Sequence, residues 1–238
     1  MARKKKQSDP AISNTTTTTT TTTTSKSTSS SKAPISTVIP DFLFLASVSA
    51  TSSENSQLLL NTGITDVLSV GKSPLFRQDG ITYHRLSLQD NQWASILAVA
   101  DEACKIIESV KSLKGKVLVH CFAGISRSPS IIAAYLMKSE GMTLRQSLEA
   151  LIRARDQVKP NTGFLRQLFD MEKELLGNKG IPSIPSFKRL IGYGSNDTLE
   201  QLLQDPSIRE DDESRNTLER ALFGSWLESI RLAQASSK

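Results

Sequence analysis

The pattern of apolar and polar positions between residues 36 and 176 predicts strands that alternate with helices. Short runs of apolar and branched side chains predict strands at residues 42–46, 64–70, 81–86 and 117–120. Apolar residues that recur every three or four positions predict helices at residues 53–60, 95–113, 130–138, 143–153 and 162–176. The second of these helices is followed by Gly115, a residue type that suits the turn after a helix. Strands that alternate with helices are typical of a single α/β domain with a central mixed, mostly parallel sheet flanked by helices.

The segments on either side of this domain differ from it in composition. Residues 1–35 contain an unbroken run of ten Thr next to Ser and Lys, and this predicts a disordered tail that cannot bury enough apolar surface to fold. Residues 177–196 are rich in Gly and Pro and predict a linker. Residues 197–238 predict an amphipathic helical extension, with start signals at Asp212–Ser214 and apolar residues at four-residue spacing (Leu218, Leu222, Trp226 and Ile230). This helix is expected to pack back on the domain, to fray in solvent or to bind a partner protein.

The net charge of +5 belongs to the N-terminal tail. Residues 1–35 hold six basic residues and one acidic residue, so the rest of the chain holds 23 of each sign. A body without excess positive charge lacks the electrostatic footprint of a nucleic-acid-binding domain, and no nucleic-acid partner is expected. The basic cluster Arg3–Lys6 is compatible with a nuclear address, a docking site for an acidic groove or a solubilising tail.

Composition also limits the compartment and the cofactors. Two Cys residues cannot form a disulfide-dense scaffold, so a reducing compartment is expected, cytoplasmic and/or nuclear. Two Cys and two His cannot form a four-ligand zinc site unless all four take part or carboxylates are recruited, and we expect no metal and no cofactor. The sequence has no run of 18 apolar residues, so no membrane span is predicted, and the N-terminus lacks the apolar core of a secretory signal.

The segment His120–Ser128 carries the candidate chemistry, because it joins a predicted strand to a predicted helix. Such a junction turns successive backbone N–H groups toward one concavity, which binds an anion with the helix dipole behind it. Gly124 permits the tight turn, and Arg127 can donate two hydrogen bonds to a phosphate. Cys121 sits at the mouth of this cradle, where its thiolate is favoured and can attack a bound phosphate. Cys104 lies inside a predicted helix among apolar residues and is expected in the core.

Cys121 to Arg127 match the Cys-x5-Arg signature, and the chain resembles the protein tyrosine phosphatase superfamily. The string His120 to Pro129 is similar to the dual-specificity phosphatases of the small atypical type, and the resemblance covers residues 36–176, including 88–91 and 158–164. It implies hydrolysis of phosphotyrosine and of phosphoserine or phosphothreonine in proteins through a phosphocysteine intermediate. The implied partner is a phosphoprotein substrate, with kinases among the candidates.

The resemblance also implies a role for each matching residue. Cys121 is the nucleophile, and Arg127 binds the phosphate and stabilises the transition state. Asp90, 31 residues before Cys121, is the general acid and then the base that activates water. Ser128 helps Cys121 to leave as a thiolate. The remaining residues form or support the phosphate-binding loop: His120, which orients the loop and tunes the cysteine, Phe122, Ala123, Gly124, Ile125 and Ser126, with Asn161 supporting them.

Two departures from the superfamily bear on the substrate. No Trp-Pro pair precedes Asp90, unlike in the strict tyrosine phosphatases, and this implies a shallower pocket that also reaches phosphoserine and phosphothreonine. No Lys lies inside the loop, unlike in many lipid phosphatases of the superfamily, and this argues against a polyphosphoinositide or an RNA 5′-triphosphate. Three alternatives stay open: a non-protein substrate (phosphoinositide, RNA 5′-phosphate or glycan), a non-catalytic phospho-binding scaffold, and a main function in the extension at 197–238.

Overall fold

The structure is a computed structural model that describes residues 34–176 and 212–236. The predicted linker and all but the last two residues of the predicted disordered tail lie outside the described residues, as do residues 197–211 and 237–238 of the predicted extension.

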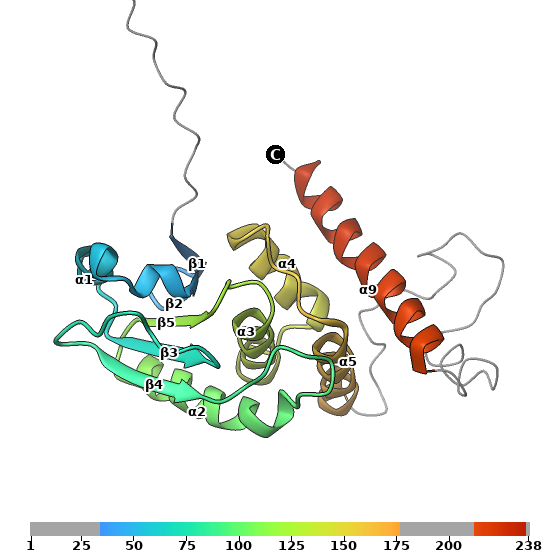
Figure 1. Ribbon diagram of the computed structural model, residues 1–238, viewed down its shortest axis with the longest axis horizontal. Helices are drawn as coiled ribbons and strands as arrows, with labels where there is room; N and C mark the ends of the chain where they lie inside the picture. The colour runs from blue at the N-terminus through green and yellow to red at the C-terminus, as the bar shows by residue number, and fades with distance from the viewer. Residues whose placement is uncertain (1–33, 177–211, 237–238) are drawn as a thin grey trace, which may run out of the picture. The chain divides into compact units, whose positions relative to one another are not determined.

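The described residues form a five-stranded sheet with the order β1-β2-β5-β3-β4 (Figure 1). Neighbouring strands are parallel except for β1 and β2, which are antiparallel. The mixed, mostly parallel sheet flanked by helices is therefore confirmed. The strands are β1 (Ile35–Ile39), β2 (Leu43–Ser47), β3 (Asp66–Val70), β4 (Thr82–Leu86) and β5 (Val117–Cys121).

The sheet separates two hydrophobic cores, because successive side chains of a strand point to opposite faces. In β5, Val117, Val119 and Cys121 join the larger core, while Leu118 joins the smaller one. Every residue of β5 is buried, which is expected for the central strand of a sheet covered on both faces. Cys121, the predicted nucleophile, therefore lies at the end of a strand that is buried along its whole length.

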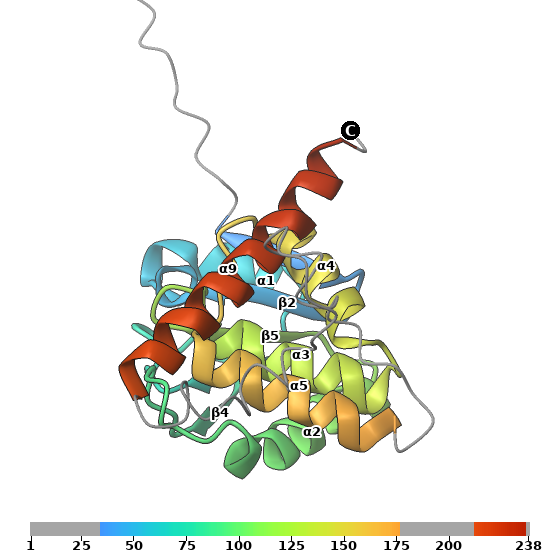
Figure 2. The same ribbon diagram turned by 90° about the vertical axis from the view of Figure 1, so that its right-hand side faces the viewer.

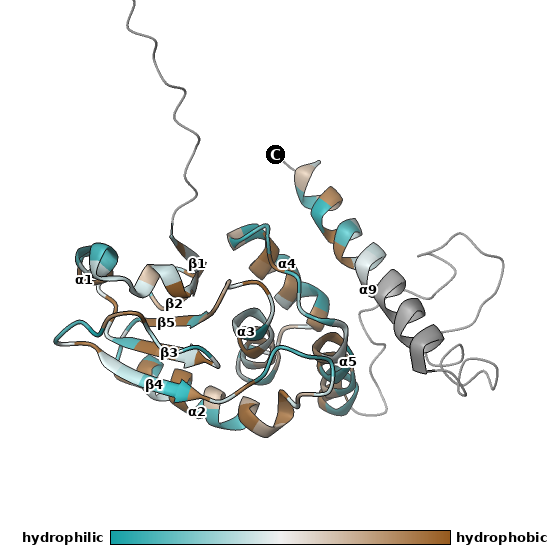
Figure 3. Ribbon diagram, in the orientation of Figure 1, coloured by the Kyte–Doolittle hydropathy of each residue, from teal (hydrophilic) through white to brown (hydrophobic). Residues whose placement is uncertain are grey.

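Helices cover both faces of the sheet. The smaller core includes Leu59 of α1, and the larger core includes residues from α2, α3, α4 and α5, with α3 lying beside α5 (Figures 1 and 2). Figure 3 shows both apolar and polar stretches along α2 and α4. Their buried residues recur mostly at intervals of three or four, as amphipathic surface helices require. The helices are α1 (Ser56–Thr62), α2 (Leu97–Ser112), α3 (Arg127–Ser139), α4 (Leu144–Ala154), α5 (Thr162–Leu176) and α9 (Asp212–Ala235), with 3₁₀ turns η1 (Val48–Thr51) and η2 (Ser53–Asn55).

Three local predictions differ from the structure. The antiparallel strand β1 was not predicted, since its Ser and Thr continue the composition of the tail. Helix α3 begins at Arg127, three residues earlier than predicted, because the loop runs directly into the first turn. The left-handed residue after α2 is Lys114, with φ of 55°, and not Gly115. Gly115 instead allows a close approach, since a Cβ there would lie 2.5 Å from Thr65 Oγ1.

Helix α9 packs back on the domain. Its residues Trp226, Leu227 and Ile230 are buried in the larger core, and the helix contacts α4 and α5. The structure thus shows the first of the three behaviours that the sequence allowed for this extension. Among the described helices, none has the length and apolar character to cross a membrane.

Candidate active site

Cys121 ends β5, and its side chain is 1% exposed. Its sulfur accepts two hydrogen bonds at 3.2 Å, one from the backbone N–H of Gly124 and one from the hydroxyl of Ser128. Two donors directed at one sulfur stabilise negative charge on it. The structure thus brings Ser128 to the position in which it can support Cys121 as a leaving thiolate.

The orientation of the loop peptides follows from their carbonyl groups. Four loop carbonyls accept hydrogen bonds from partners on the outer side of the loop, and in a planar trans peptide the next N–H points the opposite way. The N–H groups of Ala123, Gly124, Ser126 and Arg127 are therefore directed into the concavity, and the Gly124 N–H does meet the Cys121 sulfur there. The carbonyl contacts are Val48 N to Phe122 O, Arg155 Nη2 to Ala123 O, Lys159 N to Ile125 O and Ser130 N to Ser126 O.

Gly124 is required at the turn of this loop. Its φ is 69°, a region that L side chains rarely adopt, and a Cβ there would lie 2.6 Å from the carbonyl oxygen of Ala46. The loop therefore packs directly on the backbone of β2, which fixes the cradle against the sheet.

Arg127 is the first residue of α3, and its side chain is 16% exposed. Its Nε is buried without a hydrogen-bond partner and lies 3.4 Å from Asp90 Oδ2. Gly71 makes room for the guanidinium, because a Cβ at this position would lie 2.5 Å from Arg127 Nη1. Buried donors without an acceptor are rare in folded proteins, so this guanidinium is suited to an anion as its acceptor.

Asp90 lies at the rim of the cradle, in the loop between β4 and α2. Its Oδ1 accepts hydrogen bonds from Ser126 Oγ at 2.7 Å and from Asn161 Nδ2 at 3.0 Å. These two hydrogen bonds hold the carboxyl group in place. Its side chain is 35% exposed, so the group is also open to solvent. The structure thus gathers the carboxyl group, the guanidinium of Arg127 and the thiol of Cys121 in one site.

Asn161 supports this arrangement from the loop before α5. Its backbone N–H donates to Ser126 Oγ at 3.1 Å, and its Oδ1 accepts from Phe164 N at 3.0 Å. The side chain is thereby fixed by the first turn of α5 while its Nδ2 reaches Asp90. The structure thus places Asn161, for which the resemblance implies a supporting role, in contact with both Ser126 and Asp90.

His120 is buried beneath the loop between two partners. Its Nδ1 lies 3.1 Å from the carbonyl oxygen of Cys121, and its Nε2 lies 2.9 Å from Ser69 Oγ. A carbonyl only accepts, so Nδ1 carries the proton and Nε2 accepts from the Ser69 hydroxyl. Burial lowers the pKa of His120, and a neutral ring held at both nitrogens is suited to orienting the loop.

The buried His120 predicts a pH dependence of stability. The pKa of His120 in the folded protein lies below its ordinary value. As the pH falls, His120 is therefore protonated in the unfolded chain before it is protonated in the folded protein. The free energy of unfolding should then decrease as the pH falls below about 6.5, by up to ~1.4 kcal/mol per pH unit from this group. Denaturant unfolding of the wild type and of His120→Gln between pH 5 and 8 checks this. Equal slopes for the two proteins would contradict it.

Several residues that shape the site carry no signal in the sequence motif. Ser69 meets His120 only because the parallel register of β3 and β5 pairs these two positions. Gly71 follows two residues later, beside the guanidinium of Arg127. Arg155 reaches the loop from the end of α4. Aligning β3 with β5 residue by residue would have identified Ser69 and Gly71 as neighbours of the site. Nothing in the sequence around Arg155 indicates that it contacts the loop.

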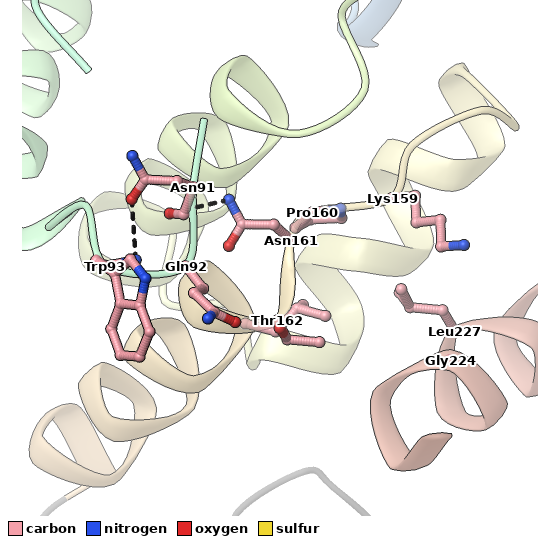
Figure 4. Close-up of a pocket in the computed structure, with 10 residues that line it drawn as sticks. Asn91, Gln92, Trp93, Lys159, Pro160, Asn161, Thr162, Gly224 and Leu227 are labelled. Carbon is pink, nitrogen blue, oxygen red and sulfur yellow. Dashed lines mark hydrogen bonds between the residues drawn. The ribbon is translucent and has the colours of Figure 1, made fainter. Parts of the chain in front are cut away.

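A pocket of about 540 Å³ adjoins Asp90 (Figure 4). Asn91 joins it to the catalytic residues, because its carbonyl oxygen accepts from Asn161 Nδ2 at 3.4 Å. Its side-chain oxygen accepts from the backbone N–H of Trp93, whose indole is 70% exposed. The lining residues come from the Asp90 loop, the segment before α5, α5 itself and α9: Asn91, Gln92, Trp93, Lys159, Pro160, Asn161, Thr162, Leu165, Gly224 and Leu227.

Comparison with known proteins places this chain in a family. A family model described as the catalytic domain of dual specificity phosphatases matches residues 43–174. "Dual specificity protein phosphatase 1" of Arabidopsis thaliana is 38% identical over 59% of this chain and 71% of its own length. "Dual specificity protein phosphatase 5" of Rattus norvegicus is 37% identical over 61% of this chain, but the match spans only 38% of that protein.

Solved structures agree with this result. The crystal structure of human DUSP28 has a TM-score of 0.57 and 29% identity, over 61% of this chain and 97% of that one. The human tyrosine phosphatase-like serine/threonine/tyrosine-interacting protein has a TM-score of 0.56 and 30% identity, over 60% and 98%. The fold and the site define a cysteine-based protein phosphatase. The chain belongs to the dual specificity phosphatase family.

Proposed function

We propose that this protein hydrolyses phosphotyrosine and phosphoserine or phosphothreonine in proteins through a phosphocysteine intermediate. The observation that carries the proposal is the Cys121 sulfur at the base of a loop whose amides point inward, with Arg127 at the end of that loop 3.4 Å from Asp90. Amides and a guanidinium that converge on one concavity stabilise the charge on the equatorial oxygens of a transferring phosphoryl group.

The proposed reaction has two steps. In the first, the Cys121 thiolate attacks phosphorus, the bond from phosphorus to the substrate oxygen breaks, and Asp90 donates its proton to that oxygen. In the second, Asp90 takes a proton from water, the water oxygen attacks phosphorus, and the S–P bond breaks. Ser128, which donates to the sulfur at 3.2 Å, stabilises the departing thiolate. Inorganic phosphate and the starting enzyme result.

The surroundings of the site support a protein substrate. The pocket beside Asp90 is separate from the cradle and leaves room for residues that flank the phosphorylated one. Trp93 in the lining of this pocket and Phe122 in the loop are both exposed and offer apolar contacts to a bound protein. Aromatic side chains of this kind contribute much of the contact energy when proteins bind.

A panel of substrates tests the function. Phosphate release would be measured with EDTA present from a phosphotyrosine peptide, a phosphothreonine peptide, a doubly phosphorylated peptide and a phosphoinositide. Turnover of both types of singly phosphorylated peptide is expected. Turnover of the lipid alone would move the assignment to a non-protein substrate, and turnover of phosphotyrosine alone would reject dual specificity.

A binding scaffold is the second candidate, because one of the similar structures is a phosphatase-like interacting protein. A pure binder does not need a nucleophile, and this chain holds Cys121, Arg127 and Asp90 in one site. Release of at most one phosphate per protein molecule, with retained phosphopeptide binding, would favour the scaffold.

Replacing Asp90 by Asn should lower kcat according to the leaving group. We expect a loss of about 10²-fold on a phosphothreonine peptide, because an alkoxide leaves poorly without a proton. The loss on p-nitrophenyl phosphate should be far smaller, since nitrophenolate leaves without protonation. Parallel rate measurements with the two substrates check this, with Asp79→Asn at an exposed position as the control. Equal losses on both substrates would rule out Asp90 as the general acid.

A further inference from the structure

We propose that Arg231 of helix α9 is a positioning residue for catalysis, which makes the C-terminal helix a working part of the phosphatase. The inference rests on the proposed function, and it assigns to α9 a role beyond packing. Arg231 acts through the segment 155–161 between α4 and α5, which touches α9 on one side and the catalytic residues on the other.

Helix α9 is fixed on the domain by contacts that are independent of Arg231. Trp226 and Ile230 are fully buried, and Gln234 Nε2 donates to the carbonyl oxygen of Glu149 in α4 at 2.6 Å. These contacts hold the helix along the domain. Arg231 is therefore carried on a seated helix, one turn after Leu227, which lines the pocket beside Asp90.

Arg231 binds two backbone carbonyls of the segment 155–161. Its Nη2 donates to Val158 O at 2.7 Å, and its Nε donates to Asp156 O at 3.2 Å. Glu228, one turn earlier in α9, lies 3.2 Å from Nη1 and holds the guanidinium from the helix side. A rigid planar fork of donors fixes two carbonyls relative to each other more firmly than a single flexible donor does.

The same segment holds the catalytic residues. Arg155 Nη2 donates to Ala123 O at 3.2 Å, and Lys159 N donates to Ile125 O at 2.8 Å. These are two of the four carbonyl contacts that turn the loop amides inward. At the end of the segment, Asn161 Nδ2 donates to Asp90 Oδ1 at 3.0 Å. Both the phosphate cradle and the general acid thus depend on where the segment lies.

Both carbonyls that Arg231 binds lie between two of the residues that contact the loop, Arg155 and Lys159. Asp156 O lies between Arg155 and Lys159, and Val158 O directly precedes Lys159 N. Val158 itself is buried in the larger core. Loss of the guanidinium would release the outer side of the segment while the core still holds Val158, so the expected effect is a small displacement rather than unfolding. Even a small displacement of this kind reduces the rate, because the reacting groups must be aligned.

The test compares Arg231→Ala with Gln234→Ala in the full chain. Arg231→Ala removes two side-chain hydrogen bonds from α9 to backbone carbonyls of the segment 155–161. Gln234→Ala removes one such bond, to the carbonyl oxygen of Glu149 in α4. We expect Arg231→Ala to lower kcat on a phosphothreonine peptide by about 10-fold. Arg231→Lys should recover part of the loss, and added methylguanidinium should recover part of it in Arg231→Ala. Gln234→Ala should keep the wild-type kcat.

Two further measurements separate positioning from stability and from the proposed function. Thermal unfolding midpoints show whether the two variants are destabilised equally. The affinity for inorganic phosphate reports the cradle without turnover and should be weaker in Arg231→Ala than in Gln234→Ala. If the wild type binds phosphate but turns nothing over, the proposed function fails while this comparison still tests Arg231. Equal phosphate affinities and equal kcat values in the two variants would overturn the inference.

Discussion

Replacing Cys121 by Ser should remove turnover and leave phosphate binding in place. The Ser hydroxyl is a far weaker nucleophile than a thiolate, and within the described residues the hydrogen-bond partners of the sulfur are Gly124 N and Ser128 Oγ, which are donors and not bases. Loss of a nucleophile in a well-studied hydrolase costs about 10⁶-fold in kcat, and we expect a loss of at least ~10⁴-fold here. Initial rates on the phosphopeptides measure it.

The loop carbonyls that orient the inward amides are held by partners other than the sulfur, and a Ser hydroxyl can still accept from Gly124 N–H, so the variant should still bind phosphopeptide with an affinity close to that of the wild type. Cys104→Ser is the matched control, because Cys104 is half-buried in α2 and burial raises the pKa of its thiol to about 11. This control should keep full activity. Retained turnover in Cys121→Ser, or its loss in Cys104→Ser, would show that the nucleophile is wrongly assigned.

The candidate site was predictable from the sequence where its residues are contiguous. Cys121, Gly124, Arg127 and Ser128 lie within eight positions, and the strand before them and the helix after them have clear periodicities. The same holds for much of the fold, since β2, β3 and β5 are apolar runs and helices follow β2, β4 and β5. Strand β1 was not predicted, because its residues resemble the Ser- and Thr-rich tail. Only its antiparallel pairing with β2 identifies it as a strand.

The residues that position the site were not predictable in this way. Ser69 and Gly71 act on residues about 50 positions later, and only the register of β3 against β5 brings them there. Arg231 lies 73 residues from the carbonyl it binds at Val158. The four-residue spacing of α9 predicts a helix with one apolar face, but it does not reveal which surface that face covers. Long-range contacts of this kind depend on packing, which local periodicity does not encode.

Replacing Arg127 by Lys should be nearly as damaging as the loss of the nucleophile, although the charge is kept. A lysine ammonium cannot donate two parallel hydrogen bonds, and it does not fill the space beside Gly71, whose missing Cβ admits Arg127 Nη1. Arginines that stabilise transferring phosphoryl groups contribute about 10³–10⁵ in kcat, so we expect a loss of ~10³-fold on every substrate. Rates on a phosphotyrosine peptide and on p-nitrophenyl phosphate should fall together, unlike those of Asp90→Asn. Arg153→Lys, at an exposed position of α4, is the control.

The double variant Arg127→Lys with Asp90→Asn adds a test of their coupling. Arg127 Nε lies 3.4 Å from Asp90 Oδ2, so each residue helps to place the other, and the two losses should combine to less than their product. Phosphate affinity should fall in Arg127→Lys and stay close to wild type in Asp90→Asn, because only the guanidinium is directed at the anion. Strict multiplication of the two losses would mean that the contact has no role in turnover. Unchanged phosphate affinity in Arg127→Lys would mean that the loop amides alone hold the anion, and the guanidinium would then act only in the transition state.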